Sequence, residues 1–218
     1  MERVVCLAIG YVFGMFQTAF IYGKMNGIDI REHGSGNSGT TNALRVLGKK
    51  AGAIVLFGDV MKTVLAILLA RFLYRSMGPE MMKLLSLYAG AGAILGHNFP
   101  FYLNFKGGKG IAATAGLITA FDWRFFIICA IAFFTAFFIT HYVSLGSLLV
   151  YFFFVVTMFA LGQMGVLGVT EQTHLYEMYA LSLFLAAMAY IKHAPNIKRL
   201  LQGTERKTYL TKKSGEEV

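Results

Sequence analysis

Apolar residues in this chain form long runs that are separated by short polar segments. Several runs approach the roughly 20 residues that a helix needs to span a bilayer. The pattern therefore predicts an all-α polytopic membrane protein of about seven transmembrane helices, with residues 1–218 in a single domain. The run at 111–121 is short, so a complete crossing there is left open. The expected helices lie at residues 4–23, 51–74, 84–96, 111–121, 125–140, 145–162 and 178–191.

Composition supports the membrane assignment. Hydrophobic residues make up 56% of the chain and charged residues only 14%, whereas soluble domains carry about 25% charged residues. The net charge is +9. In a membrane protein such an excess of Lys and Arg marks cytoplasmic loops, so no nucleic-acid partner is expected. Cys6 and Cys129 both lie in apolar runs, which excludes a disulfide framework and a cysteine-based zinc site.

The distribution of charge predicts the orientation. Segments 24–50, 106–109 and 192–218 are basic, whereas segment 163–177 contains no Lys or Arg. With the basic segments inside, the N-terminus is outside and the C-terminus is cytoplasmic. If 111–121 does not cross, the count becomes five or six and one loop re-enters. With seven crossings, all glycine-containing polar segments and the break at 141–144 fall on one face.

The first polar segment, residues 34–45, matches G-x-G-x-x-G through its three glycines. A dinucleotide site would need a preceding strand and a βαβ unit, and membrane helices flank this segment, so that interpretation is rejected. Its glycines allow the backbone to approach a ligand closely, and Arg45 offers a planar fork suited to phosphate. The alternative is an ordinary capped turn. The short polar side chains that could bind a ligand are Ser35, Asn37, Thr41 and Asn42.

The second segment, residues 96–114, contains Lys106-Gly107-Gly108-Lys109-Gly110. Backbone amides together with a lysine suit a phosphate, although a polar turn between helices is the alternative. It is not a P-loop, because glycine rather than Ser or Thr follows the second lysine. His97 is interpreted as part of a helix end rather than as a catalyst.

The third segment follows the last apolar run and holds His193 and Asn196. A helical turn would place both on one side, but Pro195 makes a regular helix there doubtful. The alternative is a basic tail that binds anionic lipid. Ser144 is a candidate only because the topology places it on the same face. Within the 51–74 run, an Asp and a Lys three residues apart, Asp59 and Lys62, are expected to pair.

Carboxylates are scarce in these segments. The only Asp residues are Asp29, Asp59 and Asp122, and only Asp29 lies in a basic segment. No carboxylate pair could hold Mg²⁺ or Ca²⁺, and no histidine pair has zinc-ligand spacing. We therefore expect a cationic site for anionic substrates, with no metal and no cofactor.

Together, the three segments resemble the motifs of the bacterial acyl-phosphate:glycerol-3-phosphate acyltransferases, in the same order and over essentially the whole chain. The resemblance rests on Ser35, Asn37, Gly39, Thr41, Asn42 and Arg45, then Gly96, His97, Phe99, Pro100, Lys106 and Lys109, then His193, Asn196, Arg199, Gly203 and Glu205. The chain departs from the family at Ser38, Thr40 and His141, where Pro, Ala and Arg are common.

The resemblance implies transfer of a fatty acyl group from acyl phosphate to the sn-1 hydroxyl of glycerol 3-phosphate. The products would be lysophosphatidic acid and phosphate, in the first step of phospholipid synthesis at the cytoplasmic face of the bacterial inner membrane. The implied partners are the two substrates and membrane lipids. Acyl phosphate already carries a good leaving group, so neither a metal nor a covalent intermediate is needed.

The resemblance also implies residue roles. Arg45, Lys106, Ser144, His193 and Asn196 would position glycerol 3-phosphate, and Ser35, Asn37, Thr41, Asn42, Gly107 and Gly108 would hold acyl phosphate. The residues expected to take part in catalysis are His193, Asn196, Ser35 and Arg45. The proton acceptor is either His193 or a substrate phosphate oxygen.

Two other functions fit parts of the pattern. A small transporter of anions or lipids would place its binding residues near the bilayer midplane and would show an internal repeat. The polar segments instead gather on one face, and the sequence shows no repeat. A non-catalytic subunit that recruits anionic lipid would leave the glycine, Asn and Ser content of the first two segments unexplained.

Overall fold

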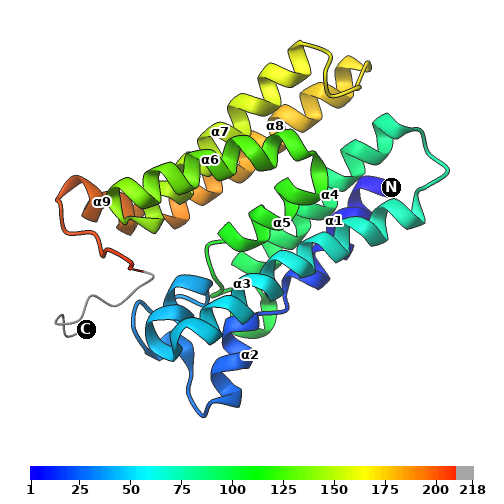
Figure 1. Cartoon of the computed structure of the whole chain (residues 1–218). Helices are drawn as coiled ribbons and strands as arrows, with labels where there is room; N and C mark the ends of the chain where they lie inside the picture. The colour runs from blue at the N-terminus through cyan, green and yellow to red at the C-terminus, as the bar shows by residue number, and fades with distance from the viewer. Residues whose placement is uncertain (210–218) are drawn as a thin grey trace.

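In the computed structural model, residues 1–209 are described, and their regular elements are all helical (Figure 1). The all-α prediction is therefore confirmed, while the end of the predicted basic tail, residues 210–218, lies outside the described residues. The helices are α1 (Glu2–Gly14), α2 (Thr18–Met25), η1 (Ile30–Glu32), α3 (Thr40–Leu73), α4 (Pro79–Asn98), η2 (Phe101–Leu103), α5 (Ile111–Phe121), α6 (Trp123–Thr140), α7 (Val143–Gln163), α8 (Gln172–Lys192) and α9 (Ala194–Leu201).

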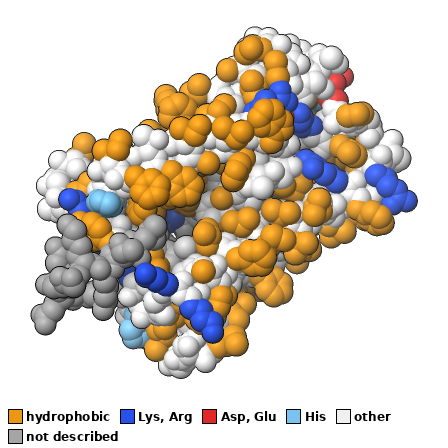
Figure 2. Space-filling view, in the orientation of Figure 1, with side chains coloured by type: hydrophobic (Ala, Val, Ile, Leu, Met, Phe, Trp, Pro, Cys, Tyr) orange, Lys and Arg blue, Asp and Glu red, His pale blue; other side chains and the backbone are white. Residues whose placement is uncertain are grey.

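The helices have the length and surface of a membrane protein. Figure 2 shows hydrophobic side chains over most of the visible face, and many large ones are exposed, including Phe134, Phe138 and Ile139 on α6. The polytopic membrane prediction is confirmed, and the count of seven crossings and the outside N-terminus stay predictions. Within residues 1–209, five stretches are long and apolar enough to cross: Glu2–Met25, Thr40–Leu73, Trp123–Thr140, Val143–Gln163 and Gln172–Lys192.

The first predicted helix, residues 4–23, is wrong as a continuous element. It is broken at residues 15–17, where α1 ends and α2 begins. Gln17 is fully buried at the break, and its Nε2 donates to the His97 carbonyl oxygen at 2.9 Å. An amide buried in an apolar interior needs such a partner, so the break is fixed by tertiary contact rather than by hydropathy.

Other boundaries also differ from the prediction. Helix α3 begins at Thr40 rather than at residue 51, and its two parts meet at a kink at Gly48 with φ 84°. Before the kink, Ala43 is buried in a small second core with Ile30 and Val55, so packing stabilises a turn that is too polar to predict from hydropathy. Helix α4 spans Pro79–Asn98 rather than 84–96, and α8 begins at Gln172 rather than 178.

Helices α1 and α4 pack with their backbones in close contact. A Cβ atom on Gly10 would overlap the Ala89 carbonyl oxygen, and one on Gly14 would overlap that of Ala93. Likewise, a Cβ atom on Gly92 or Gly96 of α4 would overlap a backbone carbonyl oxygen of α1. Small residues four positions apart permit this close packing of membrane helices. The contact fixes the C-terminal end of α4, from which the site is built.

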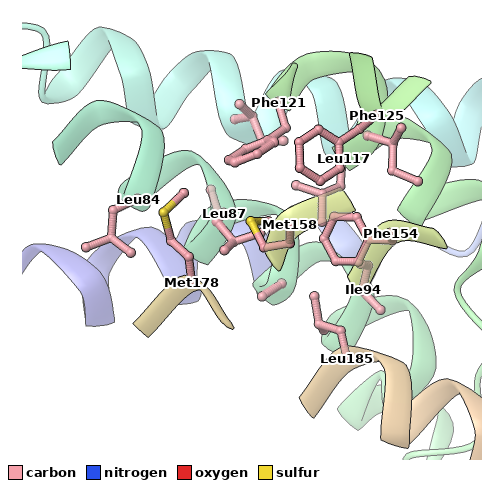
Figure 3. Close-up of a cluster of buried hydrophobic side chains, with 14 of the residues drawn as sticks. Leu84, Leu87, Ile94, Leu117, Phe121, Phe125, Phe154, Met158, Met178 and Leu185 are labelled. Carbon is pink, nitrogen blue, oxygen red and sulfur yellow. The ribbon is translucent and has the colours of Figure 1, made fainter. Parts of the chain in front are cut away.

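A large hydrophobic core joins α1 to helices α3 through α8. Figure 3 shows Leu87 of α4, Leu117 of α5 and Phe125 of α6 meeting Phe154 of α7 and Leu185 of α8. All five side chains are completely buried. The core therefore lies between the layer of α6, α7 and α8 and the layer of α1, α3, α4 and α5 (Figure 1).

Polar contacts gather at the two ends of the helical bundle. At one end, Arg3 pairs with Glu177 at 2.6 Å, and Lys83 bonds to Asp122 and to the Leu167 carbonyl oxygen. These contacts tie the starts of α1, α4, α6 and α8 together. The opposite end holds the start of α3, the loop before α5, the α6–α7 connection and the end of α8, which are the segments predicted to form the site.

Candidate functional site

The first polar segment is organised by Asn42, which lies in the first turn of α3 and not in a loop as predicted. Its Nδ2 donates to the carbonyl oxygens of Ile30 and His33, at 3.1 and 3.0 Å, and its Oδ1 accepts from the Ser35 amide at 2.8 Å. Asn42 is buried, at 2% exposed. Its side chain thus holds the glycine-containing loop against the helix, and a direct contact with substrate stays a prediction.

Three buried hydroxyl groups at this end of the bundle have no hydrogen-bond partner among the described residues. They belong to Ser38, Thr40 and Ser144. Ser38 and Thr40 lie at the N-terminus of α3, where unpaired amides and the helix dipole favour an anion. A buried polar group without a partner costs free energy, so these hydroxyls are well suited to binding a polar ligand. Of the other predicted residues in the first segment, Thr41 and Asn37 are half-buried and Ser35 is exposed.

The glycine loop between α4 and α5 does not present the amides that the sequence suggested. The Gly107 amide donates to the Asn98 carbonyl oxygen at 3.2 Å, and the Gly108 amide donates to that of His97 at 3.1 Å. Both groups are therefore already used to fasten the loop to the end of α4. In this conformation the predicted phosphate cradle cannot come from these two amides.

The two lysines of this loop lie in different surroundings. Lys106 is exposed, while Lys109 is half-buried and donates its Nζ to Oδ1 of Asn196. Nδ2 of Asn196 in turn donates to Glu205 at 2.8 Å, and the other oxygen of Glu205 accepts from Arg199 at 2.8 Å. This chain of contacts joins the glycine loop to α9, where Pro195 is accommodated because it lies in the first turn, where a helix tolerates proline. The doubt about a helix at Pro195 was therefore wrong.

Burial lowers the pKa of Lys109 from its ordinary value to about 8. The neighbouring positive charges of Arg199, Arg45 and Lys192 contribute to this lowering, and Glu205 partly offsets them. Several cations therefore surround Lys109, and a single carboxylate lies among them. A bound phosphate would relieve this repulsion, so the electrostatics of the site favour an anion.

His193 lies at the junction of α8 and α9 and is 3% exposed. Its Nδ1 lies 2.8 Å from the Ala189 carbonyl oxygen. A carbonyl oxygen can only accept, so Nδ1 carries the proton and Nε2 carries a free lone pair. Burial, assisted by the charge of Lys109, lowers the pKa of His193 to about 4. The imidazole is therefore neutral near pH 7, with an acceptor nitrogen.

A buried polar network lies beneath the glycine loop. Nζ of Lys62 bonds to Asp59 at 2.8 Å, to Nδ1 of His97 at 2.8 Å and to the Phe16 carbonyl oxygen at 2.6 Å. The expected pairing of Asp59 and Lys62 is confirmed. His97 is 3% exposed. Its contacts agree with a helix-end role, and the network links the α1–α2 break, α3 and α4.

The structure gathers some of the predicted site residues and leaves others at the edge. Arg45, His193 and Asn196 surround the Arg199–Glu205 pair, whereas Lys106 and Ser35 are exposed. Sequence reasoning gave no role to Lys109 and Glu205, although both stand in the motifs that it quoted. Thr208, which accepts from Arg45 at 2.7 Å, follows the third motif, and no sequence signal singles it out.

The arrangement is that of an anion site beside a neutral imidazole. Within residues 1–209, no group of three or more His, Cys, Asp or Glu side chains is placed to hold a metal ion. The cations come from Arg45, Lys109, Lys192 and Arg199, and they outnumber the one nearby carboxylate. Such a site can bind phosphate groups and orient a hydroxyl toward Nε2 of His193.

Comparison with known proteins finds a matching family model and similar sequences. The family model described as glycerol-3-phosphate acyltransferase matches residues 4–203. The chain is 38% identical over 209 residues to the glycerol-3-phosphate acyltransferase of Clostridioides difficile (strain 630), with 94% of each protein covered. It is 36% identical over 202 residues to that of Bacillus subtilis (strain 168), covering 92% of this chain and 95% of the relative.

Solved structures show the same fold. The chain is similar to the crystal structure of PlsY (YgiH), an integral membrane glycerol 3-phosphate acyltransferase, in its glycerol 3-phosphate form. The TM-score is 0.81 and the identity 27%, over 96% of each chain. The lysophosphatidic acid form of that protein matches with a TM-score of 0.77 and 26% identity, again over 96% of each chain.

Proposed function

Because this chain belongs to the glycerol-3-phosphate acyltransferase family, we propose that it transfers a fatty acyl group from acyl phosphate to the sn-1 hydroxyl of glycerol 3-phosphate. The observation that carries the proposal is the group of cations around Lys109 next to the neutral, acceptor-only Nε2 of His193. Two phosphate-bearing substrates and one hydroxyl nucleophile match those features. The products are lysophosphatidic acid and phosphate, which begin phospholipid synthesis.

The contacts support a role for each residue. Arg45 and Lys109 bind the phosphate of glycerol 3-phosphate, with Lys106 at the rim, and Asn196 orients Lys109 through their hydrogen bond. The hydroxyl of Ser144 and the start of α3, with Ser35, Asn37, Ser38, Thr40 and Thr41, lie on the same end of the bundle and supply donors for the substrates. The Gly107 and Gly108 amides are given no direct role, because they already donate to α4.

The chemical step is a direct acyl transfer. The sn-1 oxygen of glycerol 3-phosphate attacks the carbonyl carbon of acyl phosphate and forms the new ester bond. The bond from that carbon to the phosphate oxygen breaks, and inorganic phosphate leaves with the electron pair. The positive charges that surround the site, together with the donors at the start of α3, favour the charge that collects on the leaving phosphate.

The hydroxyl proton has two possible acceptors, Nε2 of His193 and a phosphate oxygen of the substrate. A phosphate monoester has its second pKa at about 6, whereas the pKa of His193 is lowered to about 4. Because burial makes His193 a weak base, we assign the proton to the substrate phosphate. His193 then accepts a hydrogen bond from the hydroxyl and orients it for attack.

The acyl chain has a matching groove. Helices α6 and α7 form an apolar groove of about 550 Å³, and one end of it reaches Thr140 and Leu145, next to Ser144. Its other lining residues, including Ala132 and Phe153, are almost entirely apolar in character. We assign the fatty acyl chain of the donor to this groove, because it leads from lipid to the predicted site.

The orientation in the membrane completes the proposal. Seven helical stretches, counting α1 with α2, alternate between the two polar ends of the bundle, which supports seven crossings of the bacterial inner membrane. The site end carries the basic segments, so it faces the cytoplasm under the positive-inside rule. Labelling of single cysteines at Lys106 and at Thr173 from each side of sealed vesicles would test this orientation.

The test of the activity is direct. The purified chain is supplied with long-chain acyl phosphate, and both phosphate and lysophosphatidic acid are measured with and without glycerol 3-phosphate. We expect both products only when glycerol 3-phosphate is present. No acyl transfer to glycerol 3-phosphate, or equal phosphate release in its absence, would contradict the proposal.

A further inference from the structure

A short strap follows α9 and runs back across the site end of the bundle (Figure 1). It comprises residues 204–209. Its exposed residues include Arg206 and Lys207, but Thr208 between them and the end of the strap is only 5% exposed. Burial of one small polar residue in an otherwise exposed segment marks the point where the strap is fastened.

Thr208 is fastened to two different parts of the bundle. Its amide donates to the His141 carbonyl oxygen at 2.9 Å, and its Oγ1 accepts from Nη2 of Arg45 at 2.7 Å. The Arg206 carbonyl oxygen also accepts from Nη2 of Arg45, at 3.4 Å. Thr208 therefore bridges the start of α3 to the connection between α6 and α7.

Aromatic contacts add to the fastening on the α6–α7 side. The rings of His141 and Tyr209 lie 4.7 Å apart, and Nζ of Lys207 lies 5.9 Å from the centre of the Tyr142 ring. His141 adopts a left-handed backbone conformation, with φ 59°. At its other end the strap is held by Glu205, through Asn196 and Arg199.

The partners of Arg45 are neutral. Within residues 1–209, Arg45 has no carboxylate within salt-bridge distance, and its hydrogen bonds go to a hydroxyl and a carbonyl oxygen. A neutral acceptor fixes the direction of the guanidinium group without neutralising its charge, which leaves that charge for an anionic ligand. In the same part of the chain, carboxylates pair with Arg3, Arg31, Arg124 and Arg199. Arg71, like Arg45, bonds instead to a hydroxyl and a carbonyl oxygen.

We propose that Thr208 is a positioning residue that aims the Arg45 guanidinium group at the phosphate of glycerol 3-phosphate, and that the strap thereby joins α3 to the α6–α7 connection in one binding site. The inference rests on the proposed function, because it assigns Arg45 to that substrate. It adds a residue outside the three motifs to the binding of the acceptor.

The experiment compares Thr208→Val, Thr208→Ser and the control Thr204→Val. The Val substitution at 208 removes the hydroxyl but keeps the shape and the backbone bond to His141, and the Ser substitution keeps the hydroxyl. Thr204 is an exposed threonine of the same strap. We expect Thr208→Val to raise KM for glycerol 3-phosphate about tenfold with kcat nearly unchanged, and the other two variants to match the parent protein.

A double-mutant cycle separates an action through Arg45 from a general loss of structure. Arg45→Lys keeps a positive charge but removes the planar guanidinium group. In that background Thr208→Val should change KM by less than about twofold, because the contact it removes is already absent. Thermal unfolding of each variant is measured alongside the kinetics.

The outcomes distinguish the two proposals. An unchanged KM in Thr208→Val, or equal effects of Thr208→Val in the parent and Arg45→Lys backgrounds, would overturn the positioning role. A loss of kcat and of thermal stability that Thr208→Ser does not restore would make Thr208 a purely structural residue, and would also overturn it. If the parent protein forms no lysophosphatidic acid, the proposed function itself fails.

Discussion

The imidazole of His97 lies directly against the backbone of Gly108. A Cβ atom built on Gly108 would overlap Nε2 of His97, while the Gly108 amide donates to the His97 carbonyl oxygen at 3.1 Å. Lys62 holds the other side of the ring through Nδ1 at 2.8 Å. The histidine ring therefore supports the glycine loop from beneath, and the loop carries Lys109 into the site.

This contact predicts a specific rescue. Gly108→Ala should lower kcat/KM by at least about 100-fold, because the new methyl group collides with the His97 ring and displaces the loop. In a His97→Ala background the collision is removed, so adding Gly108→Ala should then cost less than about threefold more. The measurement is lysophosphatidic acid formation by the four proteins of the cycle.

Gly107→Ala is the matched control for this rescue. A Cβ atom on Gly107 would overlap the carbonyl oxygen of His97, which the His97→Ala substitution does not remove. Its defect should therefore persist in the His97→Ala background. Equal rescue of the two alanine substitutions would show that the histidine side chain does not support the loop.

The two lysines of the glycine loop should differ in importance. Lys109 is half-buried among other charges, whereas Lys106 is exposed and its charge is screened by solvent. We expect Lys109→Met to lower kcat/KM for glycerol 3-phosphate by at least about 100-fold, and Lys106→Met by about tenfold or less. Both variants should be folded in detergent, with the same thermal unfolding temperature as the parent protein. A larger loss of kcat/KM for Lys106→Met than for Lys109→Met would assign the phosphate contact to Lys106.

The dependence of kcat/KM on pH should form a bell. Lys109 is positive below its pKa of about 8 and loses its charge as the pH rises through that value, so phosphate binding weakens there. On the acidic side, rate should rise with pH through about 6, where the substrate phosphate becomes a dianion. Lys109→Arg should remove the alkaline limb, because Arg stays charged at higher pH.

The acidic limb also tests the choice of base, within the same measurement. His193→Gln should lower kcat/KM by less than the 10²- to 10⁴-fold loss that is typical when a general base is removed. It should also leave the acidic limb of the pH profile in place. Disappearance or displacement of that limb in His193→Gln would assign the proton to His193 instead.

The groove between α6 and α7 predicts chain-length selectivity. Ala132→Phe should fill part of the groove and lower kcat/KM for long-chain acyl phosphate by more than about tenfold relative to a short-chain donor, since each buried methylene contributes about 0.8 kcal/mol. Ala160→Phe on the exposed face of α7, away from the groove, is the control. Equal losses for both donors would place the acyl chain elsewhere.

Hydropathy correctly predicted helices whose ends are marked by residues that interrupt the apolar run. Helix α5 matches its prediction at both ends, because Gly110 and Asp122 interrupt the apolar run at either side. Hydropathy could not find the start of α3, because residues 40–47 mix four polar with four apolar residues and Ala43 packs in the second core. The break before α2 depends on the contact of Gln17 with His97, which is distant in sequence.

The candidate site was predictable in composition but not in contacts. The motifs indicated a cationic, carboxylate-poor site containing Arg45, His193 and Asn196, and the structure gathers these residues. The resemblance favoured Lys106, whereas Lys109 is the lysine that is half-buried in the structure. The sequence could not show this, because two identical side chains three positions apart differ only in which one faces inward. Nor could any pattern show that the Gly107 and Gly108 amides are taken by the end of α4.

The pair formed by Asp59 and Lys62 has a consequence for biogenesis. The two charges lie three residues apart on one helix and bond at 2.8 Å, so they neutralise each other as soon as α3 forms. Charges inside a bilayer are costly when alone, so we expect this pair to ease the insertion of α3 before α4 has been synthesised. Lys62 can meanwhile bond to the Phe16 carbonyl oxygen, which was made earlier. His97 comes from α4, which is made later, so we expect the docking of α4 to complete the network and to set the glycine loop in place.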